Sequence, residues 1–312
     1  MDSFTTWILR GLNEKQGTSR LSQISDLIDW SPFRQILDGM YDNRSEKGGR
    51  PNCDVILMFK ILILQRWFGL SDLEIERQMA DRISFMSFLG FPDPIPDSRT
   101  IWLFKERISE TGKDEAIWTE LQRQLDAMGL RVKHGTIQDA TFIEADPGSS
   151  KKPHDGNSKT RRSRDGTWTK KGKKSYFGYK LHQKTDIDYG LIRGIKTTTA
   201  KVHDSQVDLS VEGEVVLRDR GYFGVSAKGV DFTMVRRTTD KPLGELDKER
   251  NRLISKLRSP GERPHAVIKR VFGAGRVLVT TVQRVCVSMM VTAFAFNLYQ
   301  LCTLKKLQVI LN

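Results

Sequence analysis

The pattern of apolar and polar positions divides the chain near residue 130. Before this point apolar residues recur at helical spacing, which predicts helices joined by short polar connections. After it, short apolar runs with partial alternation predict strands mixed with helices. The pattern therefore predicts an all-α N-terminal domain, residues 1–130, and an α/β domain, residues 131–312, in which a mixed sheet is flanked by helices.

Capping and breaking residues locate the helices of the first domain. Ser71 and Glu74 have the spacing of a capping box, in which each side chain bonds a free backbone NH of the other residue. Ser98 follows three prolines and is expected to cap another helix. The predicted helices cover residues 22–37 with a Ser-Pro break, 54–68, 72–80, 82–89, 98–110 and 113–128.

In the second domain the alternation of apolar and polar residues predicts five strands, with one helix between the third and fourth strands and further helices after the fifth. The predicted strands cover residues 135–143, 174–187, 191–199, 214–218 and 231–237. The predicted helices cover residues 204–211, most of 243–272, and 279–304. His203 and Asp204 look like a site pair, but the pattern favours Asp204 as the cap of the helix that follows it.

Residues 147–174 form a predicted loop rich in basic side chains, with Trp168 among them. Basic groups bind DNA by releasing its counterions, and an aromatic ring can stack on an unpaired base. The loop therefore predicts a DNA clamp, and a solvated surface loop is the alternative. Its basic residues are Lys151, Lys152, Lys159, Arg161, Arg162, Arg164, Lys170, Lys171, Lys173 and Lys174.

Composition narrows the class of partner. The formal net charge of +13 favours a polyanion, which is nucleic acid or an anionic membrane surface. The three cysteines form no CxxC pair, so neither a structural zinc site nor a disulfide framework is expected, as in a reducing cytoplasm. The N-terminus lacks the pattern of a signal peptide. Residues 285–304 carry no charge, but their polar side chains favour a buried core helix over a membrane span.

Three acidic residues are candidates for a metal site. Asp139 lies inside an apolar strand, Asp219 directly follows another, and Glu262 stands near the start of a predicted helix. Cleavage of a phosphodiester bond by two metal ions needs carboxylates that converge from such positions. Taken singly, each acid also has a structural interpretation, as a solvent-facing strand residue, a turn residue or a helix-start residue.

Around these acids the chain resembles a known family. Three segments look like the catalytic motifs of insertion-sequence transposases with a DDE domain, of the IS-five type within the IS-four-like group: GTIQDATFIEA, VVLRDRGYFG and GERPHAVIKRVFG. The third motif of that group is similar to Tyr-(2)-Arg-(3)-Glu-(6)-Lys. Arg258, Glu262 and Lys269 have these spacings, whereas Ser255 stands at the tyrosine position. The family's Glu-His-Pro-Phe is here Glu-Arg-Pro-His, ending at His265.

The resemblance extends into the helical front of the chain and implies a fold and a reaction. It implies an RNase H-like fold with Asp139 on the first strand, Asp219 after the fourth and Glu262 on a helix after the fifth. These acids would bind two Mg²⁺ ions, with Mn²⁺ as an alternative. Water would cut the ends of the element's terminal inverted repeats, and the freed 3′-OH would attack target DNA without a covalent enzyme intermediate.

Other basic residues are candidates for DNA contacts. Arg258 and Lys269 flank Glu262 and could hold phosphates near the scissile bond. Arg99 and Lys105 are expected on the surface of the predicted helix 98–110, which is either part of a helix-turn-helix or a packing element with basic decoration. A homodimer on double-stranded DNA, in the nucleoid of the cytoplasm, is expected from the implied function. The alternatives are an inactive DNA-binding descendant of a transposase and an RNase H-like nuclease without strand transfer.

Overall fold

A computed structural model describes residues 20–41, 51–148, 163–239 and 242–310. The chain forms two compact units. The first comprises Met1–Met128 and Asn297–Asn312, and the second comprises Gly129–Phe296. The first division lies beside the predicted boundary at residue 130, and the last segment of the chain groups with the helical unit.

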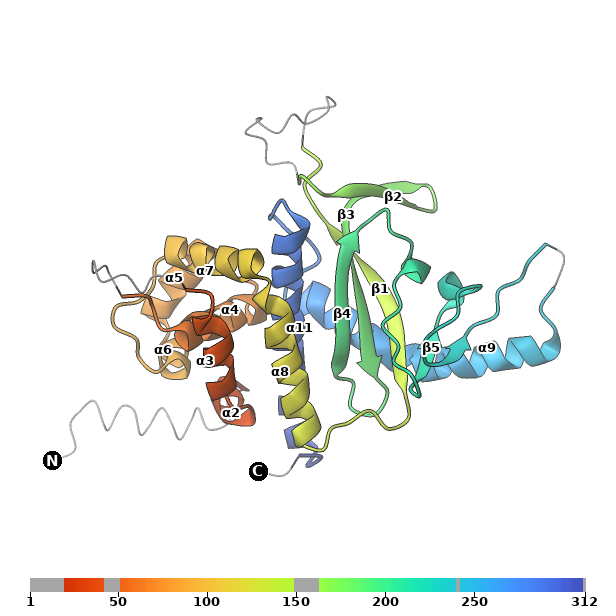
Figure 1. The fold of residues 1–312 in the computed structure, drawn as a ribbon, viewed down its shortest axis with the longest axis horizontal. Helices are drawn as coiled ribbons and strands as arrows, with labels where there is room; N and C mark the ends of the chain where they lie inside the picture. Colours follow the sequence, from red (N-terminus) through yellow and green to blue (C-terminus); the bar gives the residue numbers. More distant parts are fainter. Residues whose placement is uncertain (1–19, 42–50, 149–162, 240–241, 311–312) are drawn as a thin grey trace. The chain divides into compact units, whose positions relative to one another are not determined.

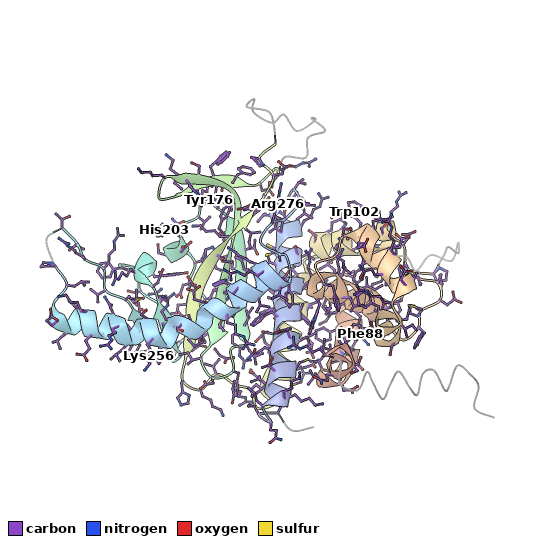
Figure 2. The ribbon with its side chains drawn as sticks, turned by 180° about the vertical axis from the view of Figure 1, so that it is seen from behind. Phe88, Trp102, Tyr176, His203, Lys256 and Arg276 are labelled. Atoms are coloured by element: carbon purple, nitrogen blue, oxygen red, sulfur yellow. The ribbon has the colours of Figure 1, made fainter. Side chains whose placement is uncertain are left out.

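The described part of the first unit is helical up to Met128, as predicted. Its helices are α2 (Arg20–Leu27), α3 (Ser31–Asp38), α4 (Val55–Trp67), α5 (Asp72–Asp81), α6 (Ile83–Leu89), α7 (Ser98–Thr111) and α8 (Lys113–Ala127). Phe88 is buried in this unit, whereas Trp102 is 44% exposed on α7 (Figure 2). Ser71 caps α5 by accepting from the Glu74 amide. The predicted cap of α7 is wrong, because the carboxylate of Asp97, not Ser98, accepts from the Thr100 amide at 2.6 Å.

The long apolar helix α11 (Val282–Lys306) runs from the second unit into the end of the first. It is the one helix in the described residues that is long enough and apolar enough to cross a membrane. Most of its apolar stretch is buried inside the protein, and that burial includes the polar side chains of Ser288, Thr292 and Asn297. This is the arrangement of a core helix, as the sequence predicted.

The second unit is built on a mixed six-stranded sheet (Figure 1). Its strands are β1 (Thr136–Glu144), β2 (Thr167–Lys171), β3 (Lys174–Asp186), β4 (Ile192–Thr199), β5 (Val215–Arg218) and β6 (Val230–Thr233). The order is β2-β3-β1-β5-β6, and β4 also pairs with β3. β1 is antiparallel to β3 and parallel to β5, while β5 is parallel to β6. β1 therefore lies between an antiparallel and a parallel neighbour.

Part of the predicted basic loop is a strand. Thr167–Lys171 pairs with β3 across a two-residue turn, in which Gly172 has a positive φ of 62°. Glycine adopts this conformation at little cost, so it suits a tight hairpin. The prediction of a loop over 147–174 is thus wrong for its last residues, and 149–162 lie outside the described residues.

Two other predicted elements are shorter than expected because long-range bonds take their backbone groups. The helix predicted over 204–211 is only a 3₁₀ turn, η1 (Asp204–Gln206). The buried side chain of Gln138 donates to the carbonyl of Val207 and accepts from the amide of Leu209, so these groups are not available to a helix. The strand predicted over 231–237 ends at Thr233, and Asn251 bonds both backbone groups of Val235.

The helical segment predicted over 243–272 consists of several pieces. It contains α9 (Glu245–Arg258), a 3₁₀ turn η3 (Ser259–Gly261), α10 (Glu262–Ala266) and a π-helical turn η4 (Val267–Val271). Ile254 of α9 packs with Ile137 of β1 and Leu217 of β5 in one buried cluster. This packing fixes α9 over the face of the sheet that carries the candidate acids.

Candidate active site

The parallel pair β1 and β5 brings two of the candidate acids to one level of the sheet. Ile137 lies opposite Leu217 at the end of the paired stretch. Asp139 and Asp219 each follow two residues later, and side chains two residues apart on a strand point to the same face. The acids therefore extend from the same face, at the place where the two strands stop pairing. Such points of divergence are where open α/β sheets form ligand sites.

Glu262 approaches this place because the residue before it has no side chain. A Cβ on Gly261 would lie 2.7 Å from Cγ2 of Ile137, a distance that real Cβ atoms essentially never show. Only glycine lets the η3 turn pass this close to β1 without a shift. Glu262, the exposed first residue of α10, is thereby held beside the strand that carries Asp139.

The electrostatics of Asp139 link the three acids. Burial raises the pKa of Asp139 to about 6, and the negative charges of Asp219 and Glu262 act in the same direction. The charge of Arg258 and a hydrogen bond from the Ala140 amide oppose this rise without cancelling it. The positive charge of Arg258 therefore does not compensate the negative charges of the three carboxylates.

Two side chains of the third motif lie next to Asp139. A terminal nitrogen of Arg258 is 3.6 Å from Oδ2 of Asp139, and Nε2 of His265 is 3.7 Å from the same oxygen. Both distances exceed those of good hydrogen bonds, so the contacts are electrostatic. The Arg258 side chain is only 13% exposed, and its buried Nε finds no hydrogen-bond partner in the part of the chain that the structure describes.

Asp219 is fixed by its own turn and by the residue before it. Its carboxylate accepts from the Gly221 amide at 2.8 Å and caps the η2 turn (Arg220–Tyr222). Arg218 is fully buried and donates to Thr233 Oγ1, to the carbonyl of Val225 and to Asp231. Arg218 therefore ties β5 both to β6 and to the end of the loop that begins at Asp219.

The donors fit a divalent cation in kind and in charge. Mg²⁺ prefers carboxylate oxygens, and a buried carboxyl group crowded by two others is stabilised by an added positive charge. Within the described ranges, however, no group of three or more His, Cys, Asp or Glu side chains lies ready to hold a metal ion. The acids are thus coupled electrostatically but are not drawn together around one point.

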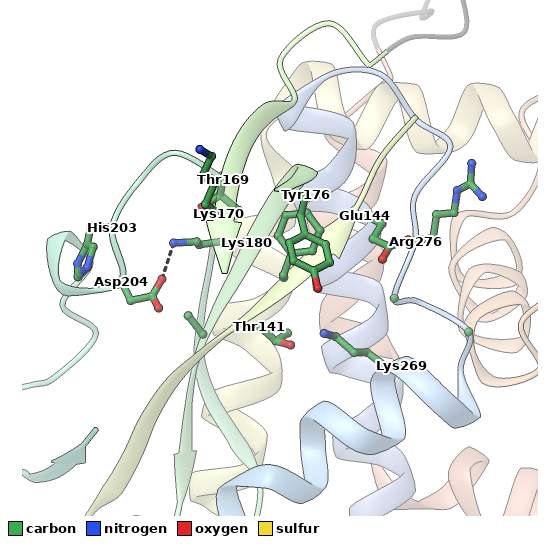
Figure 3. A pocket seen from close by; sticks show the side chains of 14 residues that line it. Thr141, Glu144, Thr169, Lys170, Tyr176, Lys180, His203, Asp204, Lys269 and Arg276 are labelled. Carbon is green, nitrogen blue, oxygen red and sulfur yellow. Dashed lines mark hydrogen bonds and ion pairs between the residues drawn. The ribbon is translucent and has the colours of Figure 1, made fainter. Parts of the chain in front are cut away.

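A cleft of about 810 Å³ opens along the second half of β1, beyond Asp139 (Figure 3). Tyr176, Lys180 and Lys269 point toward it, and the ring of Tyr176 contacts Phe142 with the centroids 5.4 Å apart. Asp204 does not cap the turn as predicted, because His203 does so and Asp204 accepts from Lys180. The other polar lining residues are Thr141, Glu144, Thr169, Lys170, His203 and Arg276. This lining suits a polyanion that carries flat rings.

The hairpin β2–β3 presents several of the predicted DNA contacts to solvent. Lys170, Lys173 and Lys174 are exposed there, and Trp168 is 56% exposed while its ring contacts Phe177. Lys171 belongs to β2, but its side chain lies outside the described part of the structure. The hairpin thus places the exposed Trp168 among lysine side chains. Trp168 lies on the same strand as Lys170, which lines the cleft.

In the helical unit the two predicted contacts differ. Arg99 is exposed on α7. The ammonium group of Lys105 instead pairs with Asp72 at 2.5 Å, with its side chain only 20% exposed. Burial lowers the pKa of Lys105, against the effect of Asp72. The expectation that Lys105 lies on the helix surface is therefore wrong, since a cation already neutralised within the fold has little charge to offer DNA.

Several residues of the site were not among the predicted ones. His265 was noted only as a departure from a motif, and Gly261 appeared only as the first residue of the third motif segment. Arg218 ends an apolar strand, where a charged residue is usually assigned to the surface. Tyr176 and Arg276 line the cleft only because the fold brings their segments beside β1, and local sequence contains no sign of this.

Two family models match the chain. A transposase domain (DUF772) matches residues 11–107, and a transposase DDE domain matches residues 131–298, which is more than half of the chain. No solved structure matches it. The chain belongs to the transposases with a DDE domain, enzymes of DNA recombination that cleave DNA and transfer strands. Enzymes of this kind typically need divalent metal ions.

Proposed function

We propose that the protein is the transposase of a bacterial insertion sequence, of the IS-five type within the IS-four-like group. It binds the terminal inverted repeats, hydrolyses a phosphodiester bond at each end to free a 3′-OH, and joins that end to target DNA. The observation that carries this proposal is the coupling of Asp139 to Asp219 and Glu262 within a DDE domain. An RNase H-like fold is supported by the mixed sheet and by the acid on its central strand.

Asp139, Asp219 and Glu262 are the proposed catalytic residues and would hold two Mg²⁺ ions, or Mn²⁺ ions. Bound there, such ions stabilise charge on the attacking and leaving oxygens of the reaction. Arg258 neutralises part of the carboxylate charge while the site is formed, and its guanidinium group can then bind a phosphate oxygen of the DNA. Lys269 can contact the same strand from the edge of the cleft.

The DNA strand that leaves the active site is proposed to follow the cleft toward the β2–β3 hairpin. Lys170, Lys173 and Lys174 lie exposed along that path, and Trp168 can stack on an unpaired base. Replacing Lys170, Lys171, Lys173 and Lys174 by glutamine should weaken DNA binding. It should also reduce the slope of log affinity against log salt by up to about 3.6, since each neutralised phosphate contributes about 0.9. An unchanged slope would remove the hairpin from the DNA path.

The helical N-terminal domain is the proposed reader of the DNA ends. Arg99 is exposed on α7 and can contact the DNA backbone, whereas Lys105 serves the fold through Asp72. Two ends must be held together for transposition, so we propose a homodimer on DNA, located with the nucleoid in the cytoplasm. The net charge of +13 supports the DNA partner.

The test is incubation of the full chain with its element's inverted-repeat ends, a target plasmid and Mg²⁺. Joined product is the result we expect. Nicking without joining would instead support a nuclease, and binding alone an inactive descendant, for which Ser255 at the family's tyrosine position is the sequence argument. Asp139→Asn, Asp219→Asn and Glu262→Gln should each lose cleavage and keep DNA binding. Residual cleavage by all three variants would refute the assignment of the catalytic acids.

A further inference from the structure

His265 is a buried histidine whose polar atoms are unused. It is 7% exposed, and neither Nδ1 nor Nε2 has a hydrogen-bond partner among the described residues. Nε2 lies 3.7 Å from Oδ2 of Asp139, which is too far for a hydrogen bond. Leaving a buried polar atom without a hydrogen-bond partner is unfavourable, so the ring of His265 is a candidate to bind a water molecule or an ion.

The imidazole ring of His265 is a side chain of the kind that binds metal ions. A neutral imidazole has one nitrogen lone pair, which is the donor that His offers to metal ions.

The separation of His265 from Asp139 also suits shared coordination. Ligands of one transition-metal ion lie about 2.0–2.2 Å from it, so two neighbouring ligand atoms are about 3–4 Å apart. We propose that His265 is a nitrogen ligand, together with Asp139, of a divalent cation in the active site. This inference rests on the proposed function, and it adds a ligand that the three acids do not include.

A nitrogen ligand changes which cation the site prefers. Imidazole suits transition metals, while Mg²⁺ favours oxygen ligands and water. The site should therefore bind Mn²⁺ more tightly than Mg²⁺. The family motif usually has phenylalanine where this chain has His265, so the preference would belong to this chain and to others with histidine there.

The direct test is pulsed electron paramagnetic resonance of Mn²⁺ bound to the full, metal-free chain. Coupling to a ¹⁴N nucleus, lost in His265→Phe, is the expected result. His265→Phe should also raise the Kd for Mn²⁺ by about 10–100-fold and change that for Mg²⁺ by much less. Absence of nitrogen coupling in the unmodified chain would decide against His265 without any variant, and loss of an observed coupling in His265→Phe assigns it among the five histidines.

Two outcomes separate this inference from the proposed function. Bound Mn²⁺ without nitrogen coupling would overturn the role of His265 and leave the carboxylate site standing, with a water molecule as the partner of the ring. Wild-type Mn²⁺ affinity in Asp139→Asn would instead overturn the carboxylate site itself.

Discussion

Two arginine–aspartate pairs of the second unit have opposite physical character. Arg218 is fully buried and bonds to Asp231, Thr233 and Val225. Burial tends to raise the pKa of Asp231, but hydrogen bonds from Thr233 and the charge of Arg218 outweigh it, and the pKa lies below its ordinary value. Asp231 is exposed to solvent, whereas the buried guanidinium group of Arg218 has three hydrogen-bond acceptors and leaves only Nη1 without a partner among the described residues. A buried arginine bonded in this way is typical of a structural role.

The pair of Arg258 and Asp139 is left incomplete. Its nearest charged atoms are 3.6 Å apart, and no described residue forms a hydrogen bond with Nε of Arg258. Burial raises the pKa of Asp139 to about 6 despite Arg258. The difference between the pairs indicates where the fold leaves an electrostatic need unmet, and such places are candidates for function. Changes in the first pair should therefore affect stability, and changes in the second should affect activity.

The largest effect is expected from Asp139→Asn. Loss of a carboxylate from the active site should reduce strand cleavage by more than about 1000-fold, because metal-ion catalysis supplies several kcal/mol. The free energy of unfolding should not fall, since a crowded, buried charge is removed. A cleavage assay and urea unfolding measure the two effects, and a destabilised but active variant would reverse the comparison.

Arg218→Met should show the opposite behaviour. Removing the guanidinium group leaves the Val225 carbonyl and the Thr233 hydroxyl without their donor and should lower the free energy of unfolding by about 1–3 kcal/mol. Urea unfolding is the measurement, with Arg218→Met/Asp231→Leu as the matched control. The double variant should recover little of the loss, because Asp231 is exposed to solvent, whereas full recovery would make the ion pair itself the source of the stability.

Arg258→Gln should lower the cleavage rate by about 100-fold, the scale of losing one donor that stabilises developing charge. Its free energy of unfolding should change by no more than about 1 kcal/mol, because the pair with Asp139 is loose. Arg252→Gln, on an exposed position of the same helix, is the control and should leave both quantities unchanged. Strong destabilisation by Arg258→Gln alone would make this pair structural as well.

Two buried histidines differ in a similar way, since His182 has a hydrogen-bond partner and His265 has none among the described residues. Nε2 of His182 lies 2.9 Å from the Thr198 hydroxyl. Burial lowers the pKa of His182 from 6.5 to about 4; Lys180 and Lys196 act in the same direction, and Asp204 opposes them. The unfolded chain thus takes up the proton first as pH falls. The contribution of His182 to the free energy of unfolding is largest above about pH 6.5 and decreases toward pH 4. The decrease between pH 7 and pH 5 is about 2 kcal/mol.

Urea unfolding at several pH values measures this effect. His182→Gln, which keeps a hydrogen-bonding group near Thr198, should reduce the slope of stability against pH. An unchanged slope would assign the acid sensitivity to other groups.

The smallest effect is expected from Gly261→Ala. The added methyl group would lie 2.7 Å from Cγ2 of Ile137, so the turn that carries Glu262 should shift away from β1 and slow cleavage by about tenfold. Gly244→Ala is the control, since its Cβ would find only Asp247 Oδ2 at 3.8 Å. Equal activity of the two variants would show that the close approach of η3 does not position Glu262.

Local pattern accounts for much of this fold. The apolar periodicity of α4 and α11 and the apolar run of β5 predicted these elements because each depends on its own burial. β2 was missed, since a strand of threonine, lysine and tryptophan gains its stability from pairing with β3. The helix predicted over 204–211 failed because Gln138, far away in sequence, takes its backbone groups.

The candidate site also has features that the sequence predicts and features that only the fold reveals. The order of Asp139, Asp219 and Glu262 on strand, strand end and helix could be inferred from sequence and motif spacing. Their electrostatic coupling through Asp139 could not, because it depends on the parallel register of β1 and β5 and on the contact of Gly261 with Ile137. The solvent exposure of Lys105 was mispredicted for the same reason, since Asp72 comes from another helix.

The most direct test of the account is to map the cation site on the polypeptide itself. Fe²⁺, which can replace Mg²⁺ at oxygen ligands, reduces added hydrogen peroxide to a hydroxide ion and a hydroxyl radical, and the radical cuts the backbone near the bound ion. The account predicts cuts close to residues 139, 219 and 262, suppressed by excess Mg²⁺ and lost in Asp139→Asn. Cuts confined to other parts of the chain, or an unchanged pattern in Asp139→Asn, would contradict the claim that these three acids form one metal site.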